Sequence, residues 1–220
     1  MVLSYVEKNG VSLNHIDTLS TYSVDQFMAI DSATRKSLEL TQNLADGSKS
    51  YTLLEVLDRC ITAMGSRLLR RWIEQPLLNI QNIKARQNSV EIFLKETFVR
   101  ANLREALKRL SDIERLVSRI STGFSSPRDL AALRGSLLTL PKIHQALIHH
   151  NEDRIKELKE QISDHHELSQ LLEKAIRADP PHTLKEGGVI QKGYDLELDK
   201  LRELSQNGKQ YIALLEQQER

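Results

Sequence analysis

Helix-breaking residues are rare along this chain, and their scarcity constrains its fold more than any other feature. The 220 residues include nine glycines and five prolines, whereas average usage would give about 26 of the two together. Leucine, glutamate, lysine, arginine and glutamine are frequent instead, and all five favour helices. We therefore expect a mainly α fold, a multi-helix bundle with one or two short β-strands near the N-terminus.

Charge and hydropathy exclude several classes of protein. Lysine and arginine total 31 against 30 aspartates and glutamates, which gives a net charge of +1. Dedicated nucleic-acid-binding domains usually carry a strong basic excess. No apolar run approaches the roughly 18 residues that a transmembrane helix needs. The single cysteine, Cys60, cannot form an internal disulfide and fits a reducing compartment.

The first fifty residues give mixed signals. Residues 1–8 resemble a helix end closed by Asn9-Gly10, and residues 11–26 an irregular connection. The apolar run 27–30 fits a strand or a helix segment equally well. A turn or cap is expected over 31–34, a short strand over 37–41 from its alternating apolarity, and a loop over 43–50.

From Thr52 onward, capping residues recur just before apolar residues at helical spacing. The expected caps are Thr52 with Glu55, Thr62, Asn79, Ser111 with Glu114, Ser126 with Asp129, and Asp195. The helix over 64–72 carries Leu69 and Trp72 on one apolar face, and we expect it at the centre of the core.

The last helix, from Asp195 onward, carries an early apolar stripe formed by Leu198, Leu201 and Leu204. We expect this stripe to pack on the core and to fix the base of the helix. Beyond Asn207-Gly208, which weaken a helix, the sequence becomes polar, and we expect that end to project away. Around Ile212 and Leu215 the stripe should be exposed or covered by a second copy of the chain.

Catalytic and metal-binding patterns are absent from the sequence. It has no G-x-x-x-x-G-K-[ST] phosphate loop, no G-x-G-x-x-G and no H-E-x-x-H. The histidine doublets at 149–150 and 165–166 place neighbouring side chains about 100° apart on a helix, an unsuitable geometry for one shared ion. We expect no catalytic residue, no cofactor-binding residue and no metal site in this chain.

Two charged groups have alternative interpretations. Arg67, Arg70 and Arg71 share one helical face and could contact a DNA backbone, or could pair with Glu74 or a neighbouring segment. Asp112 and Glu114 lie two residues apart, so their side chains diverge on a helix. These two carboxylates are expected in the first turn of a helix, where they offset its dipole.

Five segments, in this order, resemble the MutS family of DNA mismatch-recognition ATPases. They are residues 31–41, 52–77, 112–116, 126–130 and 179–194. The resemblance as a whole covers most of the chain, from about residue 25 to its end. The positions that match family motifs, and that we take as structural or coupling residues, are Asp31, Thr34, Arg35, Leu38, Leu57, Met64, Gly65, Arg67, Arg70, Trp72, Pro76, Asp112, Glu114, Arg115, Pro127, Asp129, Pro180, Pro181, Gly188, Gly193 and Tyr194.

The resemblance implies an excised core/lever module. Residues 1–26 would be the end of the connector and a linking segment, 27–194 the helical core, and 195–220 the start of the lever helix leading to the clamp. The mismatch-reading Phe-x-Glu and the phosphate loop are absent, so the chain would hold no cofactor, and ATP and Mg²⁺ would bind the parent's ATPase domain.

The resemblance also implies that the module is not an enzyme. It would couple the position of the DNA clamp to the nucleotide site. Its partners would be the other parent domains. The parent would bind mismatched double-stranded DNA, dimerise, and be cytoplasmic and nucleoid-associated in bacteria, with no membrane contact. The chain alone should not hydrolyse ATP, and should bind DNA weakly without mismatch preference. The alternative is a free-standing helical protein-interaction module, which the length of the native reading frame would distinguish.

Overall fold

The computed structural model describes residues 8–9, 24–150 and 152–218, with side chains described as far as residue 208, apart from those of residues 24 and 206. Most of the expected helix end over 1–8 and most of the connection over 11–26 therefore lie outside the described residues. The stripe around Ile212 and Leu215 lies outside the described side chains.

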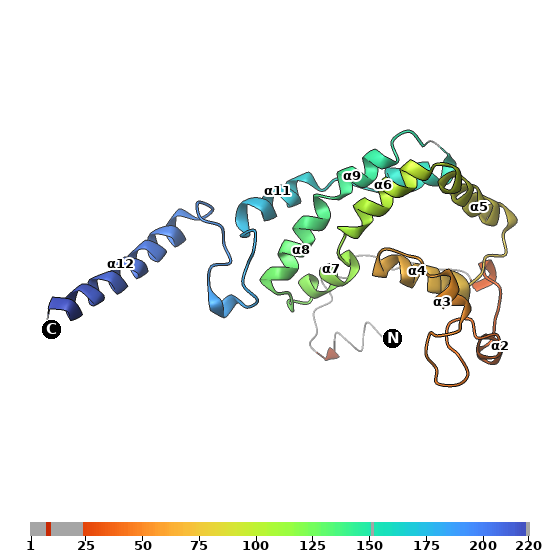
Figure 1. Ribbon diagram of the computed structural model, residues 1–220, viewed down its shortest axis with the longest axis horizontal. Coiled ribbons are helices and arrows are strands. Elements are labelled where there is room, and N and C mark those ends of the chain that lie inside the picture. The colour runs from red at the N-terminus through yellow and green to blue at the C-terminus, as the bar shows by residue number, and fades with distance from the viewer. Residues whose placement is uncertain (1–7, 10–23, 151, 219–220) are drawn as a thin grey trace. The chain divides into compact units, whose positions relative to one another are not determined.

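Over the described residues the fold is mainly α-helical, as expected (Figure 1). The helices are α2 (Ser32–Ser37), α3 (Leu53–Leu57), α4 (Ala63–Glu74), α5 (Ile80–Lys95), α6 (Thr97–Lys108), α7 (Ile113–Ser121), α8 (Pro127–Leu137), α9 (Leu140–Ala146), α10 (Asp153–Glu160), α11 (His166–Ala175) and α12 (Leu196–Gln218), with 3₁₀ turns at Val24–Gln26 and Leu184–Glu186. Extended pairing in this part of the chain consists of two isolated antiparallel bridges, Phe27 with Leu77 and Ile176 with Ile190.

Most of the expected caps form. The side chains of Thr52, Thr62 and Asn79 accept backbone N–H bonds from residues three positions later. Ser126 and Asp129 bond each other reciprocally at the start of α8. Asp195 accepts from the N–H groups of residues 197 and 198. These hydrogen bonds satisfy N–H groups that have no partner inside the helix.

The cap expected at Ser111 is wrong. Asp112 is the N-cap of α7 and accepts from the Arg115 N–H at 3.3 Å. The Ser111 N–H instead donates to the Ser136 hydroxyl at 3.0 Å. A carboxylate one residue further along thus takes the capping role, and the start of α7 is tied to Ser136, which is fully buried.

The strand expected over 37–41 is also wrong. Asp31 caps a helix over Ser32–Ser37 by accepting from the Thr34 N–H at 2.8 Å and its hydroxyl at 2.9 Å. Glu39 then takes a left-handed backbone conformation, with φ of 46°, which reverses the chain. Leu38 consequently stays 59% exposed. The local hydrogen bonds of the cap prevail over a short alternating pattern.

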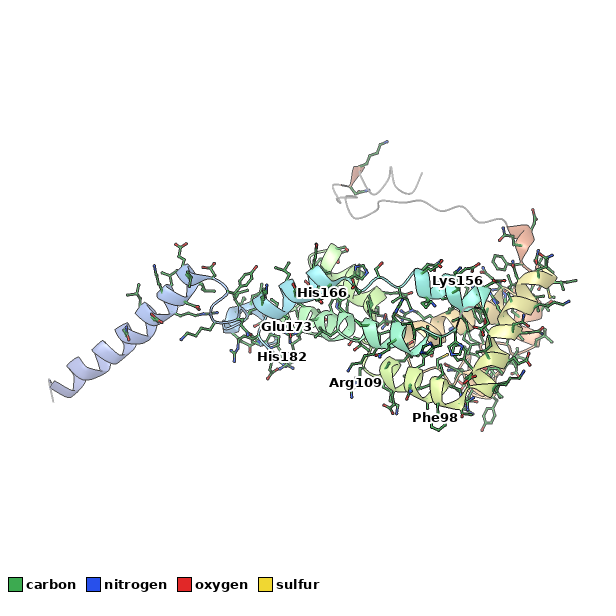
Figure 2. All side chains as sticks on the ribbon, turned by 90° about the horizontal axis from the view of Figure 1, so that it is seen from above. Phe98, Arg109, Lys156, His166, Glu173 and His182 are labelled. Carbon is green, nitrogen blue, oxygen red and sulfur yellow. The ribbon has the colours of Figure 1, made fainter. Side chains whose placement is uncertain are left out.

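The chain divides into two compact units, residues 1–125 with 135–164, and residues 126–134 with 165–220. The core of the first unit is formed by α5, α6, α9 and α10, around Ala106, Ile143, Leu147 and Ile155. The core of the second includes Leu133, Leu172, Ala175, Ile176 and Val189. Other apolar side chains remain outside both cores, and Figure 2 shows Phe98, 84% exposed, at the outer edge of α6.

Helix α4 is less central than its sequence suggests. None of its residues is buried, and Trp72 is 37% exposed. One face of the indole is covered by the Arg86 guanidinium, whose central carbon lies 3.8 Å from the ring centroid. The apolar periodicity correctly identifies a helix face, but a long cationic side chain covers part of it.

Trp72→Ala is therefore expected to lower the free energy of unfolding by only about 1–2 kcal/mol, less than the about 3–5 kcal/mol of a fully buried ring. Trp72→Phe should retain part of this energy, because a ring face remains for Arg86. Urea denaturation measures both variants. A loss above about 3 kcal/mol, together with Trp72 fluorescence shielded from acrylamide, would contradict the half-exposed placement.

Helix α12 continues through Asn207-Gly208 without interruption. Its early stripe packs less than expected, because Leu201 is 58% and Leu204 67% exposed, while Leu198 is half-buried. Polar contacts near Asp199, described below, attach this end of the helix. None of the described helices is long and apolar enough to cross a membrane.

Candidate functional site

The first two motif segments meet in the first unit. The Leu54 N–H donates to the Leu40 carbonyl at 2.9 Å, and the Thr41 hydroxyl donates to Glu74 Oε1 at 3.2 Å. Arg70 Nε holds the same Glu74 oxygen at 2.9 Å. Residues that follow α2 are thus bonded to both α3 and α4. Of the motif positions named above, Arg70 takes part in this contact through Glu74.

The second and third motif segments are joined by Arg67. Its two terminal nitrogens donate to both oxygens of Asp112, at 2.7 and 2.8 Å, and Nη2 also contacts Glu114. A bidentate guanidinium–carboxylate pair is directional as well as charged. We call Arg67, Asp112 and Glu114 the α4–α7 ion-pair cluster. It fixes the start of α7 against α4.

The cluster shifts the ionisation of its members. The Arg67 guanidinium, by donating hydrogen bonds to the carboxylate, lowers the pKa of Asp112 to about 2. The same two carboxylates raise the pKa of Arg67 above its usual value. Both shifts favour the charged pair.

The folded protein should therefore lose stability in acid through Asp112. Because its pKa is lower in the folded than in the unfolded state, the carboxylate stabilises the fold above its ordinary value near 3.8, and this contribution disappears as the pH falls to about 2. Asp112→Asn should flatten the stability profile between about pH 4 and pH 2. The control is Glu114→Gln, whose side chain is 66% exposed and should change the slope less. If stability changed with pH equally steeply in Asp112→Asn and in the unsubstituted chain, this assignment would be refuted.

The basic cluster on α4 is largely internally paired. Arg67 bonds Asp112 and Glu114, and Arg70 bonds Glu74. Arg71 is exposed. The pairing interpretation of the sequence thus describes two of the three arginines, and contact with a DNA backbone stays a prediction.

A second charged contact lies just before α4. Asp58 accepts from Lys49 Nζ at 2.5 Å and from the Ser66 hydroxyl at 3.0 Å. The Lys49 ammonium lowers the pKa of Asp58 to about 2. Burial raises the pKa of the nearby Cys60 thiol, which disfavours the thiolate needed for a nucleophile. Gly65 lies in the first turn of α4, where a Cβ would lie 3.2 Å from the hydroxyl of the N-cap Thr62, so the glycine lets this capping hydroxyl approach the helix closely.

The fourth and fifth motif segments meet in the second unit. Pro127 begins α8, and Arg128 Nε donates to the carbonyl of the buried Pro180 at 3.3 Å. Arg134 donates to the carbonyls of residues 176, 177 and 178 at distances of 2.7–3.3 Å. These carbonyls follow the end of α11 and cannot be satisfied by its last turn. Arginine thus fastens the first part of α8 to the chain beyond α11.

The loop before α12 holds the last motif residues. Gly188 has φ of 70°, and a Cβ there would lie 2.9 Å from Arg177 Nη1. The Gly193 N–H donates to Asp199 Oδ2 at 2.6 Å. Asp199 also accepts from Arg202, which donates to the Ile190 carbonyl at 3.1 Å. We call Gly193, Asp199 and Arg202 the α12 anchor, because they tie the first turns of α12 to the preceding loop.

The remaining motif residues occupy simpler positions. Pro76 provides a carbonyl that accepts from the Met28 N–H at 2.8 Å. Met64 and Pro181 are half-buried, whereas Leu57 and Tyr194 are 49% and 48% exposed. These residues form no common cluster. They are distributed along the segments that the hydrogen bonds above connect.

Sequence reasoning missed Arg134, Ser136, Asp199 and Arg202. Each acts on backbone groups far away in the sequence or in an adjoining loop, so hydrophobic periodicity carries no signal for it. The spacing of Asp199 and Arg202, three residues apart at the start of a helix, indicates an ion pair but not its attachment to the loop. No group of three or more metal-binding side chains occurs among the described residues.

The chain is similar to known proteins over nearly its whole length. The model of MutS domain III matches residues 33–218. The DNA mismatch repair protein MutS of Symbiobacterium thermophilum is 42% identical over 219 residues, covering 99% of this chain and 25% of that protein. The MutS proteins of Methanothrix thermoacetophila and Pelotomaculum thermopropionicum are 39% and 44% identical, covering 100% and 94% of this chain and 26% and 24% of those proteins. The chain thus spans about a quarter of the length of these relatives, and it belongs to the MutS family as a domain III.

Proposed function

We propose that this chain is the core/lever module of a longer mismatch-repair protein, and that it couples the position of a DNA clamp to an ATPase site. The relatives are named DNA mismatch repair proteins, and the chain corresponds to about a quarter of their length. The proposed parent binds mismatched DNA, hydrolyses ATP and dimerises in the cytoplasm. The module itself acts without cofactor or catalytic residue, and its sequence carries no phosphate loop.

The observation that carries this proposal is the α12 anchor. α12 is a 23-residue helix, so it extends roughly 34 Å at 1.5 Å per residue. Its beginning is capped by Asp195 and bonded to the 190–193 loop through Asp199 and Arg202. A helix fixed at its base moves its distant end when the base rotates. Polar anchoring of the base therefore suits a lever.

The test is made in the full-length protein that carries this segment. Arg202→Gln removes the ion pair with Asp199, and its shorter neutral side chain no longer reaches the Ile190 carbonyl while contacting Asp199. We expect the stimulation of ATP hydrolysis by mismatched DNA to fall about fivefold or more, the range of a typical coupling energy. Basal hydrolysis and DNA affinity should change less than twofold.

The matched control is Lys200→Gln, which removes an exposed positive charge two residues away. It should leave the stimulation unchanged. Full stimulation in Arg202→Gln would refute coupling through this anchor. A native reading frame that ends with this segment would instead support the free-standing interaction module.

A further inference from the structure

A small polar pocket in the first unit is not explained by the proposed function. Its walls come from α2, from the residues after it and from α4, and its volume is about 200 Å³. Three cationic side chains line it, Arg35, Lys36 and Arg70. In Figure 1, α2 and α4 lie in the same region of the ribbon, and the Thr41–Glu74 hydrogen bond joins their segments.

The pocket has an excess of positive charge. Glu74 is the one carboxylate in its lining, so the lining carries a net charge of +2. Glu74 is held by Arg70 Nε and the Thr41 hydroxyl, which leaves the terminal nitrogens of Arg70 available. The pocket is therefore electrostatically suited to an anion.

Arg35 gives the stronger indication. Its side chain is half-buried, yet its guanidinium makes no hydrogen bond or ion pair with the other residues that the structure describes. A guanidinium has five N–H donors in a fixed planar fork. Partial burial makes unpaired donors costly, and an oxyanion could satisfy several of them at once.

We propose that this pocket binds a phosphate group, as inorganic phosphate or a terminal phosphate monoester. A dianion balances the lining charge of +2, whereas a carboxylate or phosphodiester carries a single charge. The terminal oxygens of the phosphate can accept charge-assisted hydrogen bonds from Arg35, Lys36 and Arg70 together. The proposal does not depend on the lever role, because it is tested on the isolated chain and its residues are not those of the α12 anchor.

The experiment titrates inorganic phosphate into the 220-residue chain at constant ionic strength in a phosphate-free buffer, followed by ³¹P NMR. We expect saturable binding that weakens about tenfold or more in Arg35→Gln. Lys36→Gln, at an exposed position, should also weaken it. The control Arg71→Gln removes an exposed charge from α4 outside the pocket lining and should change affinity less than twofold.

Two results would overturn the proposal. One is the absence of saturable phosphate binding to the unsubstituted 220-residue chain. The other is an equal loss in Lys36→Gln and Arg71→Gln, which would mean general charge attraction. The source of the phosphate is distinguished by competition with a 5′-phosphorylated oligonucleotide and its 5′-hydroxyl form. Displacement by the phosphorylated form alone indicates a nucleic-acid end, and displacement by neither indicates free phosphate.

Discussion

Ile155→Ala should lower the free energy of unfolding of the first unit by about 2–5 kcal/mol, the range for a large apolar side chain truncated in a packed core. Ile155 is 2% exposed and belongs to the cluster with Ala106, Ile143 and Leu147. Truncation removes three side-chain carbons from this cluster. It leaves a cavity that the surrounding helices can only partly close.

The measurement is urea denaturation combined with amide exchange. The control is Leu158→Ala on the same helix, whose side chain is 44% exposed and should cost less than about 1 kcal/mol. Amides of α6 and α9 should exchange faster in Ile155→Ala, because these helices share its cluster. Equal losses in the two variants, or unchanged exchange in α6 and α9, would place Ile155 outside the core.

Much of the helical architecture follows from local sequence. The caps at Thr62, Asn79 and Asp195 were predictable because each bonds an N–H within three residues. Pro127 at the start of α8 follows from its fixed φ. These signals need no knowledge of the tertiary fold. The MutS resemblance, carried by motif order, gave the family that the comparison confirms.

What covers an apolar face was not predictable. Trp72 and Leu201 both follow helical periodicity, yet one is covered in part by Arg86 and the other is 58% exposed. Periodicity states which residues share a face, and burial depends on which segment packs there. The strand expected over 37–41 was wrong because the Asp31 cap starts a helix that runs to Ser37. Five residues of alternating apolarity were too few to indicate a strand.

The site was predictable in its residues but not in its bonds. Arg67 and Asp112 were both singled out, and the structure joins them over 45 positions of sequence. Nothing in either segment specifies that pairing. Arg134 was not singled out, because an arginine in a helix is usually a solvated residue and its acceptors are main-chain carbonyls, which have no sequence signature.

Arg134→Gln is expected to destabilise the second unit by about 1.5–3 kcal/mol, the range for hydrogen bonds that involve a charged group. The guanidinium donates to the carbonyls of three successive residues. The first of these residues, Ile176, is only 5% exposed. The shorter, neutral amide of glutamine cannot replace these charged bonds to three carbonyls. Arg134→Lys should recover less than half of the loss, since an ammonium cannot reproduce the planar fork.

The local consequence can be read at the adjoining bridge. The Arg177 N–H donates to the Val189 carbonyl, and the Gln191 N–H to the Ala175 carbonyl. Both amides should exchange faster in Arg134→Gln, because the segment that Arg134 holds is part of this bridge. The control is Lys174→Gln, which removes an exposed charge on α11. Its free energy of unfolding should stay within about 0.5 kcal/mol of that of the unsubstituted chain. If the amides of residues 177 and 191 kept their protection in Arg134→Gln, the bridge would not depend on α8, and the arginine would be a peripheral contact. If protection is lost there while α6 and α9 are unaffected, Arg134 holds together the unit from which α12 begins.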